Sequence, residues 1–179
     1  MICSLVIFLN RKSVETRKTY LYKLNKIVFN ASDNFKAAFI VLDTSIKNNV
    51  IISITHIHIY NSPIIKPIYY VINIISIKAE LFTIRCSLNQ ASCLANIKCI
   101  VIITNFIHIL KKMFNLSIYP YQIQTLAISK EIREFFKRNH YNSLEFWDCP
   151  SQDKWLLHDI VNKETKKFNL SPIFSCKSL

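Results

Sequence analysis

The 179-residue chain contains no glycine, although average usage would supply about a dozen. Every turn must therefore be built without the residue that best tolerates a positive φ angle. Asparagine tolerates that conformation next best and is abundant at the expected turns, which fall at Asn48, Asn49, Asn61, Asn96, Asn115, Asn139 and Asn142. Ile, Asn, Lys, Phe and Tyr are over-used, and our hypothesis is that many G·C to A·T changes removed glycine and converted some Asp to Asn and Glu to Lys.

Acidic residues are also scarce, with 11 Asp and Glu against 23 Lys and Arg and a formal net charge of +12. A basic protein favours a polyanionic partner such as nucleic acid. The same mutational bias can account for some of the lysines, so the charge alone is weak support. The apolar share of 51% excludes an intrinsically disordered chain and predicts a folded domain.

The six cysteines form no CxxC pair and show no other metal-ligand spacing, which argues against a zinc site. Reduced, mostly buried thiols in an intracellular protein are expected. The apolar segment 1–9 lacks a basic region and a small-residue cleavage site, so we do not interpret it as a signal peptide. The apolar stretches 67–77 and 97–110 are shorter than the roughly 20 residues that span a bilayer, so we expect buried strands and no membrane partner.

Hydrophobic periodicity divides the chain into a remnant or linker over 1–34, a domain over 35–168 and a tail over 169–179. Within the domain, strands are expected at 35–46, 50–60, 68–76, 97–104 and 143–147, and helices at 78–95, 106–115, 121–139 and 154–168. The order of elements, βββαβααβα, predicts an α/β fold with a mixed five-stranded sheet flanked by helices.

Two histidines, His56 and His58, share one face of the second expected strand. Such a pair is suitable for binding a metal, but the sequence shows no third ligand nearby. Exposed strand histidines are the commoner case, so we assign the pair no role.

Four short motifs follow the order of the expected elements: Asp43-Thr44-Ser45, Ala79-Glu80-Leu81, Ile103-Thr104-Asn105 and Trp147-Asp148-Cys149-Pro150. Their order and spacing resemble those of type 1 ribonuclease H. The segments AELFTIRCSLNQA and EFWDCPSQDKW are especially similar to the ribonuclease H segment of fungal-type retrotransposon polyproteins. The resemblance covers residues 35–168 and implies a ribonuclease H-like fold of retroelement origin.

The resemblance also implies hydrolysis of the RNA strand of RNA·DNA hybrids. In that family two divalent cations, Mg²⁺ or Mn²⁺, lie about 4 Å apart, activate a water and stabilise the leaving 3′ oxygen. The family's four carboxylate positions fall on Asp43, Glu80, Asn105 and Asn162. Only Asp43 and Glu80 keep a carboxylate and are the expected metal ligands. An amide oxygen does not offset cationic charge, so we expect weak metal binding and impaired or absent activity at a degenerate active site.

Other residues at this site have simpler explanations or are weak substitutes. Taken singly, Asp43 is explained as a turn residue after a strand and Glu80 as a first-turn helix residue favoured by the helix dipole. Asp159 lies one helical turn before Asn162 and is a weak substitute for the missing carboxylate. The family's mobile histidine has no match, and His158 is only a weak substitute for it.

Basic residues on the later helices are candidates for contact with the phosphates of a hybrid. They are Lys111, Lys112, Lys130, Arg133, Lys137 and Arg138. The alternative is a solvated helix face on which lysines pair with Glu131 and Glu134.

The leading functional prediction is therefore a ribonuclease H domain by descent that acts on RNA·DNA hybrids with impaired catalysis, or not at all. The first alternative is a non-catalytic nucleic-acid-binding module that keeps the fold and the basic face. The second is a non-functional relic, or a small membrane-associated protein built on the Ile-rich runs.

Overall fold

The computed structural model describes residues 2–6, 18–19, 21–23, 25–26, 28, 36–47, 50–59, 68–72, 76–94, 96–105, 122–148 and 155–170. Its elements are β1 (Ile2–Val6), β2 (Ala37–Lys47), β3 (Val50–Ile59), β4 (Ile68–Ile72), α2 (Ser76–Ser92), β5 (Cys99–Thr104), α4 (Gln122–Arg138), β6 (Ser143–Asp148) and α5 (Leu156–Leu170). The helix expected at 106–115, with Lys111 and Lys112, lies outside the described residues.

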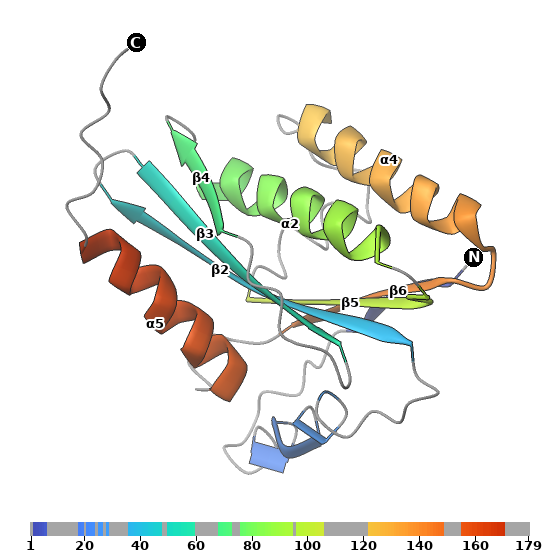
Figure 1. Cartoon of the computed structure of the whole chain (residues 1–179), viewed down its shortest axis with the longest axis horizontal. Coiled ribbons are helices and arrows are strands. Elements are labelled where there is room, and N and C mark those ends of the chain that lie inside the picture. The colour runs from blue at the N-terminus through green and yellow to red at the C-terminus, as the bar shows by residue number, and fades with distance from the viewer. Residues whose placement is uncertain are drawn as a thin grey trace.

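One mixed sheet of six strands runs through the molecule in the order β1-β6-β5-β2-β3-β4 (Figure 1). The strands β2, β3 and β4 form the expected antiparallel meander. The strands β5 and β6 continue the sheet from β2 in parallel. The α/β class and the mixed, helix-flanked sheet are thereby confirmed.

The strand β1 is an addition that the sequence did not predict. It pairs in parallel with β6, from Ile2 opposite Ser143 to Val6 opposite Trp147. We had placed this segment in a remnant or linker, because a short, mostly apolar run without a neighbouring strand or turn signal resembles many other such runs. The partner strand that defines β1 lies more than 130 residues away along the chain.

Side-chain alternation along β2 builds a separate hydrophobic core on each face of the sheet. Ala38, Ile40 and Leu42 point toward α2 and α4. Ala37, Phe39 and Val41 lie on the other face, in a core completed by α5. Figure 1 shows the same three layers, with α2 and α4 on one side of the sheet and α5 on the other.

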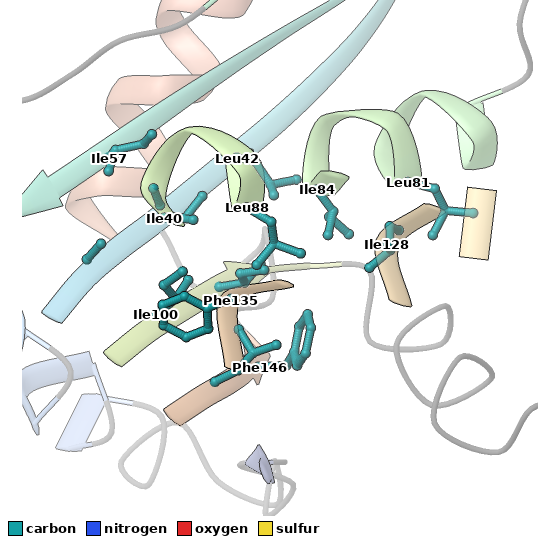
Figure 2. Close-up of a cluster of buried hydrophobic side chains, with 14 of the residues drawn as sticks. Ile40, Leu42, Ile57, Leu81, Ile84, Leu88, Ile100, Ile128, Phe135 and Phe146 are labelled. Atoms are coloured by element: carbon teal, nitrogen blue, oxygen red, sulfur yellow. The ribbon is translucent and has the colours of Figure 1, made fainter. Parts of the chain in front are cut away.

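The α2 stripe of apolar residues behaves as its helical spacing predicts. Leu81, Ile84 and Leu88 are buried in one cluster with residues of the sheet and of α4, and Figure 2 shows Leu88 near Phe135 and Leu81 near Ile128. Burying side chains of this size stabilises the fold by roughly 1.5–3 kcal/mol each. This packing fixes α2, and with it Glu80, against the centre of β2.

Asparagine does take the conformational role of the missing glycine. In the described part of the chain, Asn96 is the one residue with a positive φ, at 66°, in the connection from α2 to β5. In the turn from α4 to β6, the Asn139 side-chain oxygen accepts a hydrogen bond from the Tyr141 N–H at 2.9 Å. Asn142 then donates from its side chain to the Phe135 carbonyl at 2.8 Å, which satisfies a carbonyl near the end of α4.

Candidate active site between two helices

Asp43 lies on β2 at the point where the strand passes beneath α5. It follows Phe39 and Val41 on the face of β2 that α5 covers, and its side chain is 14% exposed. Burial raises the pKa of this carboxyl above its usual value, and the charge of His158 opposes that rise most strongly. A hydrogen bond from the Thr44 backbone, the charge of Lys166 and a hydrogen bond from the Thr165 side chain lower the pKa further.

The face of α5 that contacts Asp43 carries several polar residues. His158 and Thr165 are seven residues apart, so they lie two turns apart on one stripe, and Lys166 borders it. Asn162 falls between them on the same stripe by helical spacing and is half-buried. The position that the resemblance assigns to the fourth carboxylate is therefore on the helix face that covers Asp43.

The described residues give Asp159 no support as a replacement ligand. Asp159 is half-buried in the first turn of α5, where its backbone N–H donates to the Trp155 carbonyl at 2.8 Å. The substitute role that we considered for Asp159 stays a prediction.

Glu80 approaches the same part of β2 from the opposite face of the sheet. Its side chain is 4% exposed, and burial raises its pKa to about 7. A hydrogen bond with the Thr44 side chain lowers this pKa, while the negative charge of Asp43 raises it. Glu80 is therefore hydrogen-bonded to Thr44 and is close enough to Asp43 to be influenced by its charge.

The start of α2 changes the simpler explanation for Glu80. The helix begins at Ser76, and no acidic residue lies in its first turn. Our expectation that Glu80 lies there was wrong, because the helix starts two residues earlier than the apolar periodicity indicated. The helix dipole acts mainly on the terminal turn, so it does not account for a buried carboxyl at position 80.

Asn105 follows the last residue of β5, and its side chain is half-buried. Strand β5 pairs in parallel with β2, and Val41 is opposite Ile103. Two residues further along both strands, this register brings Asn105 to the level of Asp43. The four predicted positions therefore lie on β2, on α2, at the end of β5 and on α5, and their grouping into one site stays a prediction.

The described residues fit a weakly held divalent cation better than a tightly bound one. Within the described ranges, no three His, Cys, Asp or Glu side chains are grouped closely enough to hold a metal ion. Mg²⁺ sites, however, often use one or two carboxylates and complete the shell with water and substrate phosphates. Asp43 and Glu80 are the candidate carboxylates, and the buried Glu80 Oε2 atom has no hydrogen-bond partner among the described residues.

His56 is a buried structural residue, and our expectation of exposed strand histidines was wrong for it. Its side chain is 2% exposed, and its Nε2 atom lies 2.6 Å from Glu164 Oε2 on α5. The signal was available, because His56 shares its strand face with the core residues Ile52 and Ile54. His58 is half-buried, and burial lowers its pKa, partly opposed by a hydrogen bond with the Val28 backbone.

The candidate phosphate-binding residues on α4 are all exposed, namely Lys130, Arg133, Lys137 and Arg138. Lys137 forms an ion pair with Glu134 at 2.8 Å, as the solvated-face alternative expects. Glu131 pairs instead with Arg85 on α2, at 3.6 Å. Arg138 donates to the Ser92 carbonyl at the end of α2. Lys130 and Arg133 make no ion pair with an acidic side chain in the part of the chain that the structure describes.

Comparison with known proteins identifies the fold. No family model matches the sequence, and no curated protein matches it either. Among solved structures, ribonuclease H1 from the halophilic archaeon Halobacterium salinarum NRC-1 is similar, with a TM-score of 0.54 and 10% identity over 74% of this chain and 98% of that one. A ribonuclease H1 isolated from compost by a metagenomic approach has a TM-score of 0.55 and 14% identity, again over 74% of this chain and 98% of that one.

The compost enzyme has also been solved in complex with an RNA/DNA hybrid. That structure matches with a TM-score of 0.52 and 16% identity, over 73% of this chain and 98% of the other. The chain therefore has a ribonuclease H-like fold. No helix among the described residues is long and apolar enough to cross a membrane.

Proposed function

We propose that this chain is a ribonuclease H-like domain that binds RNA·DNA hybrids and hydrolyses their RNA strand poorly or not at all. The observation that carries the proposal is the approach of Asp43 and Glu80 from opposite faces of the sheet. Both carboxyls lie at β2, in a fold shared with ribonuclease H1, and one ribonuclease H1 was solved with a bound hybrid. Each carboxyl alone can be explained by local structure, but the two together in this fold favour descent from a metal-dependent nuclease.

Impaired catalysis follows from the charge that the site offers. A bound divalent cation would supply activation of water and compensation of phosphate charge. Asp43 and Glu80 are the residues that would hold it, and Asn105 and Asn162 contribute only neutral amides. Because burial raises the pKa of Glu80 to about 7, this carboxyl is only partly ionised at neutral pH. A cation that binds both carboxylates at neutral pH must therefore displace a proton from part of the Glu80 population, which weakens its binding.

A retroelement origin is the second part of the proposal. It is supported by the segments AELFTIRCSLNQA and EFWDCPSQDKW, which form most of α2 and the region from β6 to the start of α5. Reverse-transcriptase motifs in the reading frames that flank this gene are the expected finding. Flanking genes without any such motif would contradict this part.

Hybrid binding is tested by fluorescence anisotropy with a labelled RNA·DNA hybrid over a salt series. We expect affinity to fall as salt rises, because phosphate contacts release counterions. The double variant Lys130→Gln/Arg133→Gln removes two exposed α4 cations that make no ion pair with another described residue. It should reduce the slope of log K against log salt by roughly 1 to 2.

A matched control removes two positive charges elsewhere. Lys36→Gln/Lys98→Gln changes exposed lysines at the amino ends of β2 and β5, opposite the end that carries Asp43 and Asn105. This control should leave the salt slope unchanged. A chain that folds but does not bind the hybrid at low salt, or binds it independently of salt, would overturn the proposal.

The main alternative is a nucleic-acid-binding module without any catalytic capacity. The two asparagines at the predicted carboxylate positions favour it. It differs from the leading proposal in one respect: restoring both carboxylates would not produce cleavage. A non-functional relic is separated from both by urea unfolding, because the two-layered core predicts cooperative unfolding.

A further inference from the structure

The imidazole of His158 is buried beside Asp43 without a hydrogen bond. Its side chain is 2% exposed, and neither Nδ1 nor Nε2 has a hydrogen-bond partner among the described residues. Its Nε2 atom lies 3.8 Å from Asp43 Oδ1, which is too far for a hydrogen bond. Leaving a buried polar group in this state costs roughly 1–3 kcal/mol.

His56 differs from His158 in one ring nitrogen: its Nε2 atom has a partner, whereas its Nδ1 atom has none among the described residues. His56 Nε2 lies 2.6 Å from Glu164 Oε2, also between the sheet and α5. The separation at His158 is wider, at 3.8 Å from Nε2 to Asp43 Oδ1.

We propose that Asp43 and His158 together bind a borderline first-row divalent cation, such as Co²⁺ or Zn²⁺, in preference to Mg²⁺. The inference rests on the candidate site described above and adds His158 to it as a ligand. A cation held at about 2.1 Å by one nitrogen and one oxygen keeps those two atoms roughly 3.0 to 4.2 Å apart, for ligand angles from 90° to 180°. The observed 3.8 Å between Nε2 and Oδ1 lies within this range.

The donor set determines which cation is preferred. Mg²⁺ favours oxygen ligands, whereas imidazole nitrogen favours the later divalent first-row metals. Exchange of a carboxylate for an imidazole also lowers the negative charge of the site, which weakens Mg²⁺ binding more than that of a metal bonded to nitrogen. Lys166 borders the site and opposes any cation, so we expect weak binding with water in the remaining positions.

Calorimetric titration of the reduced full-length protein with CoCl₂ and with MgCl₂, without nucleic acid, tests the proposal. Co²⁺ should bind at least about tenfold more tightly than Mg²⁺. His158→Gln should lower Co²⁺ affinity by about tenfold and leave Mg²⁺ affinity within about twofold. Asp43→Asn, which preserves the side-chain shape, should weaken the binding of both metals. His140→Gln removes an exposed histidine and is the matched control.

Three outcomes would overturn the proposal. The first is equal affinity for Co²⁺ and Mg²⁺, and the second is an equal loss of affinity for both metals in His158→Gln. The third is a near-ultraviolet thiolate-to-Co²⁺ charge-transfer band, which would assign the binding to cysteines. If His158→Gln does not fold, ¹⁵N NMR of the wild-type imidazoles at constant pH replaces it. Adding Zn²⁺ should then change the ¹⁵N chemical shift of His158 more than that of any other histidine. These measurements are made without a hybrid, so a negative result would not contradict the proposal of hybrid binding. A failure to bind the hybrid would likewise not contradict the proposed Co²⁺ site.

Discussion

At the scale of single residues, the site is governed by how deeply its carboxyls are buried. Glu80 is 4% exposed and relies on the Thr44 side chain for its hydrogen bond. Asp43 is less buried and is surrounded by the polar groups of α5. The sequence could identify both residues as acidic and at the spacing of the ribonuclease H motifs. It could not show that burial would raise the pKa of Glu80 to about 7.

Glu80 should make the protein less stable as pH rises. Its folded pKa of about 7 lies above the usual 4.5, so the native state binds more protons than the unfolded state between these values. The free energy of unfolding should therefore fall by up to about 3 kcal/mol from pH 4.5 to 7.5. Glu80→Gln, which stays neutral, should remove this decrease, as measured by urea unfolding in EDTA. Parallel pH profiles for the two proteins would contradict the assignment.

Lys166 should weaken cation binding through its positive charge near Asp43. Lys166→Gln is expected to raise Co²⁺ affinity by about two- to fivefold, a modest effect because Lys166 is exposed. Lys163→Gln on the same helix is the control and should change nothing. Unchanged or reduced Co²⁺ affinity in Lys166→Gln, measured by calorimetry, would show that its charge does not act on this site.

At the scale of elements, α5 positions the polar residues that face Asp43. It packs against β2 and β3 through Leu157 and Val161 and is joined to β3 by the pair His56–Glu164. Periodicity in the sequence predicted α5 and most other elements to within a few residues. It did not predict the pair, because the partners are 108 positions apart and neither has a local signal for the other.

The His56–Glu164 pair should contribute measurably to the docking of α5. Glu164→Ala leaves the buried His56 imidazole without this partner and is expected to cost roughly 1–3 kcal/mol of unfolding free energy. Lys163→Ala, at the adjacent exposed position, should change stability by less than about 0.5 kcal/mol. Equal urea midpoints for the two variants would show that the pair does not hold the helix.

At the scale of the whole molecule, the described turns form without glycine: Asn96 adopts the positive φ, and asparagine side chains supply hydrogen bonds in the α4–β6 turn. The βββαβ order and the alternation along the strands made the α/β class predictable from sequence. The sixth strand was not predictable, because β1 is defined only by its pairing with the distant β6. The predicted grouping of Asn105 and Asn162 with Asp43 likewise depends on strand register and helix packing, which no local sequence pattern supplies.

Cleavage of a labelled RNA·DNA hybrid with Mg²⁺ or Mn²⁺ tests the central claim most directly. The wild-type chain should cleave the RNA strand slowly or not at all, and Asn105→Asp/Asn162→Asp should restore cleavage by returning two carboxylates to the site. Adding Asp43→Asn to that variant should abolish the restored activity. If the restored variant folds and binds the hybrid but leaves the RNA intact, the chain is not an eroded ribonuclease H, and the account is wrong.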